Sequence, residues 1–270
     1  MDNGNRRATA GAITGLLLMC AGCSSGSGTG SPTEPQGPPT VQESVVDEHA
    51  AQFDETIGDR PAGSQREFAA STYILGHLQQ AGYVPLLDPV PVEDTVRSTN
   101  VVAPPPRGAE PRVVVTAAYD TAPGIDETGV TLGVWLELAR ALYARAPDHA
   151  VEFVALGAEH SQLYGGNLGS RRLIEFLRDD DLEPLVISIE ALSEDGDAAL
   201  VFGLDAERVL SFGQDLDVPV RRAERADDAD ELFVQAGVSH VAVSGGAHPV
   251  ADLLLELLAA QDVRMTRARR

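Results

Sequence analysis

The middle of the chain constrains the fold most, because it alternates apolar strands with one long amphipathic helix. Residues 113–117 and 151–156 consist mostly of Val, Ala, Phe and Leu and predict two buried strands, and 132–144 has apolar residues at helical spacing. The pair Glu159-His160 follows the second strand closely. Ligands of open α/β sheets bind beyond the carboxyl ends of strands. The sequence therefore predicts an enzyme-type fold with its site at that end.

Similar alternation continues on both sides of this segment. It predicts a three-layer α/β/α fold with a mostly parallel, mixed central sheet covered on both faces. We expect the strand 113–117 to lie centrally, beside the strand that leads to Glu159. The other predicted helices are 41–57, 65–81, 169–178, 206–212 and 249–260, and the other predicted strands are 84–87, 100–103, 185–192, 199–202 and 240–243.

The first residues predict export and a lipid anchor. The run 8–19 is apolar, follows two arginines and is too short to span a membrane, so residues 1–22 are interpreted as a signal peptide. Small residues precede Cys23, as in a bacterial lipobox, although Cys20 stands where Leu is usual. Cys23 is therefore the predicted lipidation site. The alternative is an ordinary cleaved signal without lipid.

The remaining chain divides by composition. Residues 23–40 are rich in Ser, Gly, Thr and Pro and predict a tether, because such a segment cannot bury an apolar face. Residues 41–264 are expected to form a single α/β domain, and 265–270 a basic tail. This order predicts a lipoprotein of the bacterial cell envelope, anchored to the membrane and facing outward or into the periplasm.

Composition excludes one class of partner. The net charge is -21, and all 20 basic residues are Arg. Nucleic-acid binding needs a cationic surface, so it is not expected here. Adaptation to salt and genome composition both remain possible reasons for the acidity. Neither Ser161 nor Ser170 lies in a Gly-x-Ser-x-Gly motif, which disfavours a serine hydrolase.

Several segments are informative as motifs, namely R-P-A-G-S at 60–64, A-A-Y-D at 117–120, the stretch 123–142, L-G-A-E-H at 156–160 and H-P-V-A-D at 248–252. Together they resemble the zinc-dependent aminopeptidases of the co-catalytic metallo-exopeptidase superfamily, which also includes the glutaminyl cyclases. The similarity covers about residues 55–260. It implies the α/β/α fold of the zinc exopeptidases, of the phosphorylase/hydrolase-like type.

The resemblance also implies a metal site, and the chain departs from it. In the family, two zinc ions share a bridging Asp, and a His of the A-H-Y-D motif binds one of them. Ala118 takes the place of that His and has no donor atom. Glu127 takes the place of the bridging Asp, with Asp126 before it as an alternative ligand. Asp120 orients the missing His in the family; here it is either a residue that supports a ligand or plain surface.

The remaining positions imply at most one metal. Glu159 matches the general base, which takes a proton from the metal-bound water. His160 and Glu190 replace a Glu and an Asp ligand, whereas the late His ligand is kept as His248. Glu127, His160 and His248 would be three donors, the ligand count of a catalytic zinc. We predict that they converge on one point, with Glu159 beside it.

Three functions follow from this reading. The first is a single-zinc hydrolase that removes residues from the N-termini of peptides, with peptides as substrates. The second is a glutaminyl-cyclase-like acyl transferase with one zinc ion. The third is a catalytically impaired relative, without metal, that serves as a binding or scaffold domain. The sequence leaves the oligomeric state open. His240 begins an apolar strand and is expected to be a buried structural residue.

Overall fold

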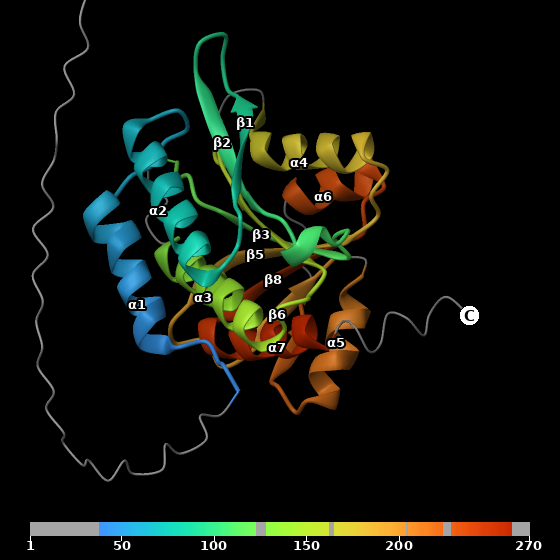
Figure 1. Ribbon diagram of the computed structural model, residues 1–270. Helices are drawn as coiled ribbons and strands as arrows, with labels where there is room; N and C mark the ends of the chain where they lie inside the picture. Colours follow the sequence, from blue (N-terminus) through green and yellow to red (C-terminus); the bar gives the residue numbers. More distant parts are fainter. Residues whose placement is uncertain (1–37, 123–127, 162–164, 204, 224–227, 261–270) are drawn as a thin grey trace, which may run out of the picture. The chain divides into compact units, whose positions relative to one another are not determined.

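One mixed sheet forms the centre of the described part of the chain, and helices cover both of its faces (Figure 1). This computed structural model describes residues 38–122, 128–161, 165–203, 205–223 and 228–260. The strand order is β1-β2-β4-β3-β5-β8-β6-β7. The strands are β1 (Leu86–Pro91), β2 (Arg97–Ala103), β3 (Val113–Ala118), β4 (Val151–Leu156), β5 (Leu185–Ser193), β6 (Ala199–Phe202), β7 (Val220–Arg222) and β8 (His240–Gly246).

The central strands are parallel. β3 lies between β4 and β5 and pairs in parallel with both, and β5 pairs in parallel with β8. β1 and β2 extend the sheet antiparallel on one side, and β6 joins β8 antiparallel on the other. The predicted fold class and the central position of β3 beside β4 are therefore confirmed. The carboxyl ends of β4, β3, β5 and β8 lie along one edge of the sheet.

Two groups of helices cover the sheet. They are α1 (Glu43–Ala51), η1 (Gln52–Ile57), α2 (Gln65–Ala81), α3 (Gly129–Arg145), α4 (Leu168–Asp179), α5 (Ala206–Asp215), α6 (Asp228–Ala236) and α7 (Ala247–Ala259), with a 3-10 turn η2 (Pro106–Gly108). One apolar cluster joins α1, α2, α3, α5 and α7 to one face, and a second joins α4 and α6 to the other (Figure 1).

Side chains of β3 alternate between these clusters. Val113 and Val115 pack with the α3 side, and Val114 with the α4 side. On the α3 side, Trp135 is fully buried and donates its indole N–H to the carbonyl of Val115 at 3.1 Å. Burial on both faces explains why the central strands are largely apolar along their length.

Some predicted boundaries differ from the structure. The strand expected at 84–87 is β1, Leu86–Pro91. Its Pro89 and Pro91 are compatible with a strand because β1 is at the edge of the sheet. The helix expected at 41–57 divides into α1 and the π-helix η1. β7 and α6 were not predicted. β7 has only three residues, too few to show a period.

The predicted signal peptide, Cys23 and most of the tether lie outside the described residues. Among the described helices, none has the length and apolar character needed to span a bilayer. The lipoprotein prediction therefore stays a prediction.

Candidate functional site

Acidic and imidazole side chains gather at the carboxyl edge of the central strands. Asp120 comes two residues after β3, and Glu159 and His160 follow β4. Glu190 is the sixth of the nine residues of β5, where the pairing with β8 is irregular between Ile189 and Leu192. Because β4, β3 and β5 are parallel neighbours, these residues share the edge at which ligands of open α/β sheets bind.

Asp120 fastens the end of β3 to the loop after β4. Its side chain is completely buried. Oδ1 accepts the main-chain N–H of Glu159 at 2.9 Å, and Oδ2 accepts that of His160 at 2.9 Å. The alternative that Asp120 is plain surface is wrong. The carboxylate of Asp120 fills a need of the backbone here. The N–H groups of Glu159 and His160 lie beyond the end of β4, outside its strand pairing, and need acceptors.

The His160 imidazole is oriented by the same aspartate. Its Nδ1 lies 3.1 Å from the carbonyl oxygen of Asp120 and 3.3 Å from Oδ1 of Asp120. Both atoms are acceptors, so Nδ1 carries a proton and the lone pair of the neutral ring is on Nε2. Histidines that bind metals are commonly held by a carboxylate or carbonyl in this way. Burial lowers the pKa of His160, but the hydrogen bond to Asp120 and the charges of Asp120 and Glu159 outweigh burial and raise it.

Glu159 faces the first turn of α4. Its Oε2 accepts the main-chain N–H of Ser170 at 2.9 Å, and its Oε1 accepts the Ser170 hydroxyl. Gly169 permits this approach, because a Cβ there would lie 2.5 Å from the carbonyl oxygen of Gly157 and 3.1 Å from Oε2 of Glu159. Burial raises the pKa of Glu159 to about 7, although the hydrogen bonds from Ser170 lower it.

Glu67 supports this loop from behind and was missed by sequence reasoning. It belongs to α2 and is buried. Oε1 accepts the hydroxyl of Ser98 and the N–H of Ala158, the latter at 3.2 Å, and Oε2 accepts the N–H of Gly63. The Ser64-x-x-Glu67 spacing is a capping-box signal that predicts the local part of this role. The contacts with Ser98 and Ala158 depend on tertiary structure.

Arg60, the first residue of the R-P-A-G-S motif, is buried and binds several segments of the fold. Its Nε donates to the carbonyl of Tyr119 at 2.8 Å, and its Nη1 donates to the carbonyls of Phe53 and Gly58 at 2.6 and 2.7 Å. Its main-chain N–H donates to Thr121 Oγ1 at 2.7 Å. Arg60 thus fixes the chain as it leaves β3, next to Asp120.

Two further predicted ligands lie among the described residues. His248 is in the first turn of α7, its side chain is 85% exposed, and Nε2 lies 3.5 Å from Oδ2 of Asp252. Glu190 is partly buried in β5. Glu127 and Asp126 lie outside the described residues.

A metal site is not complete in the described ranges: no three His, Cys, Asp or Glu side chains there are placed to hold an ion together. Convergence of Glu127, His160 and His248 stays a prediction, because Glu127 is not described. One local feature fits zinc, namely His160 with Asp120 behind it. Another does not, since Ala118, where the resemblance implies a histidine ligand, ends β3 with a methyl side chain.

His240 has the structural role expected. It is buried at the start of β8, and its Nε2 lies 2.8 Å from the hydroxyl of Ser188. Its ring stacks on Phe233 with 4.5 Å between centroids. These contacts hold the imidazole in place within the fold.

Known proteins share this domain. Residues 100–231 match the model of Peptidase family M28. No curated protein sequence matches the chain. Solved structures do match, each at low sequence identity, so they show the fold.

Three of these structures illustrate the match. A leucine aminopeptidase precursor from Bacteroides thetaiotaomicron has 16% identity and a TM-score of 0.64, over 83% of this chain and 98% of that one. A zinc aminopeptidase from Bacillus subtilis has 14% identity and a TM-score of 0.61, over 77% and 86%. The glutaminyl cyclase of Tannerella forsythia has 14% identity and a TM-score of 0.67, over 82% and 99%. Residues 100–231 therefore resemble peptidase family M28, and the solved structures show that this chain shares the fold of zinc aminopeptidases and glutaminyl cyclases.

Proposed function

We propose that this protein binds peptides at the cell envelope and does not hydrolyse them by the two-zinc mechanism of its superfamily. The observation that carries the proposal is the position of Glu159. This residue matches the general base, yet both of its carboxylate oxygens accept hydrogen bonds from Ser170. A carboxylate held by two donors of its own fold is less available to take a proton from a water molecule.

The altered ligands support the same proposal. Ala118 contributes no donor, so a two-zinc site of the family type lacks one of its histidines. His248 is largely exposed and lies near Asp252. Asp120, Glu159 and Glu190 still make this edge of the sheet acidic, although the first two are held by hydrogen bonds within the fold. An acidic edge favours the free amino group of a peptide N-terminus.

A single-zinc hydrolase or acyl transferase is the second candidate, favoured by the Asp120–His160 pair. In that case His160, His248 and Glu127 would hold the ion. Bound zinc supplies a Lewis acid and an acidified water. Glu159 would turn from Ser170 to act as the base.

Zinc analysis and activity assays on the purified protein separate these candidates. We expect less than one tightly bound zinc per chain and no zinc-dependent hydrolysis of leucine p-nitroanilide or cyclisation of an N-terminal Gln peptide. We expect binding of a labelled peptide with a free N-terminus, weakened by N-acetylation. Stoichiometric zinc, together with turnover that Glu159→Gln abolishes and Glu183→Gln preserves, would establish the second candidate instead.

The envelope location is tested separately. We propose that Cys23 carries a lipid, from the small residues before it and the Ser/Gly/Pro-rich segment after it. Cys23→Ala should move the protein from the membrane fraction to the soluble fraction, whereas Cys20→Ala should not. Membrane retention of the Cys23 variant would contradict the anchor.

A further inference from the structure

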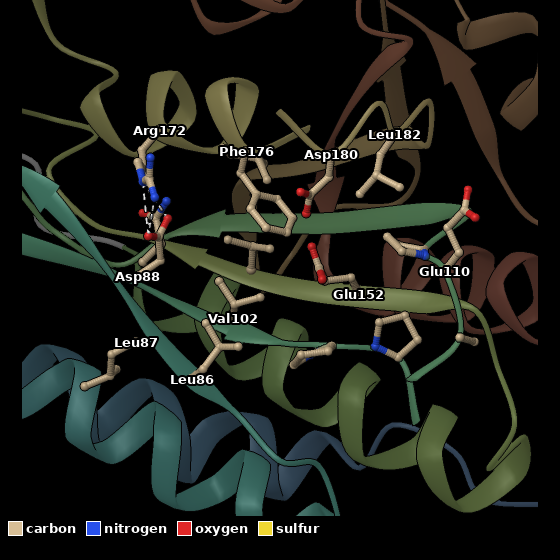
Figure 2. Close-up of a pocket in the computed structure, with 17 residues that line it drawn as sticks. Leu86, Leu87, Asp88, Val102, Glu110, Glu152, Arg172, Phe176, Asp180 and Leu182 are labelled. Atoms are coloured by element: carbon tan, nitrogen blue, oxygen red, sulfur yellow. Dashed lines mark hydrogen bonds and ion pairs between the residues drawn. The ribbon is translucent and has the colours of Figure 1, made fainter. Parts of the chain in front are cut away.

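A cavity of about 460 Å³ lies between α4 and the strands β1, β2 and β4, and Figure 2 shows its lining. Its walls are mainly apolar and include Leu86 and Leu87 of β1, Val102 of β2 and Phe176 of α4. Leu86 and Leu87 are each 47% exposed, so apolar surface continues to the outside. Pockets of this size and character typically bind small organic molecules.

Glu152 is the unusual residue of this cavity. It is the second residue of β4, and its carboxylate projects from that strand toward the side where Asp180 and Leu182 lie (Figure 2). The residue is 4% exposed, and Oε1 has no hydrogen-bond partner among the described residues. Burying an unpartnered polar atom costs free energy. An apolar side chain would fit the strand pattern better, since Val154 points to the same face.

The charged residues around the cavity leave Glu152 without a cation. Arg172 is the one basic residue in the described lining, and it is paired with Asp88 by hydrogen bonds of 2.9 to 3.1 Å. Glu110 and Asp180 lie exposed in the lining (Figure 2). The cavity therefore combines apolar walls with an excess of negative charge.

We propose that this cavity binds a small apolar molecule with one protonated amine, whose ammonium group donates to the Glu152 carboxylate. The apolar body would contact Leu86, Val102 and Phe176. The ammonium group would supply the donor that Oε1 lacks, in a charge-assisted hydrogen bond. A carboxylate ligand would be repelled by Glu152, Glu110 and Asp180.

This site is separate from the peptidase edge. Glu152 lies near the start of β4, whereas Glu159 follows its end. The strand residues 152–156 alone span about 13 Å. The proposal therefore does not depend on whether the domain hydrolyses peptides.

Binding should depend on pH. Burial raises the pKa of Glu152 to about 7, so the empty cavity holds a neutral carboxyl group at lower pH. An ammonium ligand favours the ionised form, and its affinity should fall as the pH decreases from 8 to 6. The other charged groups of the lining are Asp88, Glu110, Arg172 and Asp180.

Calorimetric titration of the full protein with 2-phenylethylamine tests the proposal, with 2-phenylethanol and 3-phenylpropanoate as matched probes. We expect one amine to bind per chain. The alcohol should bind the wild type about tenfold or more weakly than the amine does, and the amine should bind Glu152→Gln more weakly by a similar factor. Both changes remove a charge-assisted hydrogen bond. The exposed control Glu183→Gln should leave amine binding unchanged. The carboxylate should not bind.

A second variant fills the cavity. Val102→Trp should abolish amine binding while circular dichroism shows an intact fold. If Glu152→Gln does not fold, this variant alone tests whether the amine binds in the cavity. Equal binding of amine and alcohol, or amine binding unaffected by Glu152→Gln and Val102→Trp, would overturn the proposal. Neither result would bear on Glu159 or on peptide binding.

Discussion

Two glutamates of this domain are buried almost equally and have different surroundings. Glu67 is 3% exposed and Glu152 is 4% exposed. Burial is the largest cause that raises the pKa of each to about 7. Glu67 nevertheless accepts hydrogen bonds from Gly63, Ser98 and Ala158. Glu152 has a buried oxygen without a partner in the described structure, and it borders a cavity.

The difference shows that a raised carboxyl pKa does not by itself identify a site. Desolvation produces the shift in both residues, but the partners decide what the residue does. Glu67 joins α2 to β2 and to the loop after β4, so it stabilises the fold beside Asp120. Glu152 has no such contacts in the described part of the chain, so its burial lowers the stability of the fold. A cost of this kind is typical of functional positions.

Glu67→Ala should have the largest effect of the changes that test this comparison. It leaves the Ser98 hydroxyl and the N–H groups of Gly63 and Ala158 without their acceptor in a buried place. We expect a loss of about 3 to 5 kcal/mol in the free energy of unfolding, from the cost of several unsatisfied donors. Urea unfolding followed by circular dichroism measures it. Glu67→Gln keeps one acceptor and should lose clearly less; equal losses would mean that packing matters more than hydrogen bonding.

Glu152→Leu should raise the free energy of unfolding, whereas Glu67→Ala lowers it. The folded-state pKa of about 7 is above the ordinary value of 4.5, so the folded state retains a proton that the unfolded chain releases. The wild type therefore loses stability as the pH rises from about 4.5 through 7. The variant should be more stable by about 2 to 3 kcal/mol at pH 8, with a much smaller difference at pH 5.

Unfolding curves at both pH values check this prediction. Glu183→Gln, at an exposed position, is the control and should change stability little at either pH. A variant less stable than the wild type at pH 8 would mean that Glu152 has a favourable partner in the folded protein.

Ser98→Ala should have the smallest effect. It removes one of the donors to Glu67 and leaves the N–H groups of Gly63 and Ala158 in place. We expect a loss of about 1 to 2 kcal/mol, as for a hydrogen bond to a carboxylate. In a double-mutant cycle with Glu67→Gln, the two losses should not add, because the residues share one bond. Additive losses would mean that Ser98 and Glu67 stabilise the fold independently of each other.

Much of the fold followed from local pattern. The strands 151–156 and 199–202 and the helix 65–81 lie where their periodicity predicts them. The parallel order of β4, β3 and β5 agrees with the strand–helix alternation. β7 has only three residues, too few to show a period, and is defined by its pairing with β6; the short helix α6 was also missed, although it buries Phe233.

The candidate site was predicted less completely. Sequence spacing placed Glu159 and His160 after a strand, and their position at the carboxyl edge agrees with that. It did not show that Ser170 binds Glu159 or that Asp120 holds His160, because these partners are 11 and 40 residues away in the chain. The predicted joint ligation by Glu127, His160 and His248 stays a prediction.

The sequence by itself determined the layers of this protein, because hydrophobic periodicity dictates which faces of strands and helices are buried. Through its resemblance to the family, the sequence also predicts that Ala118 stands where the relatives have a ligand histidine. Only the tertiary structure decided what the buried carboxylates do. Glu67 and Glu152 are both single acidic residues in regular elements, and their roles differ because distant segments bring donors to one and an apolar cavity to the other.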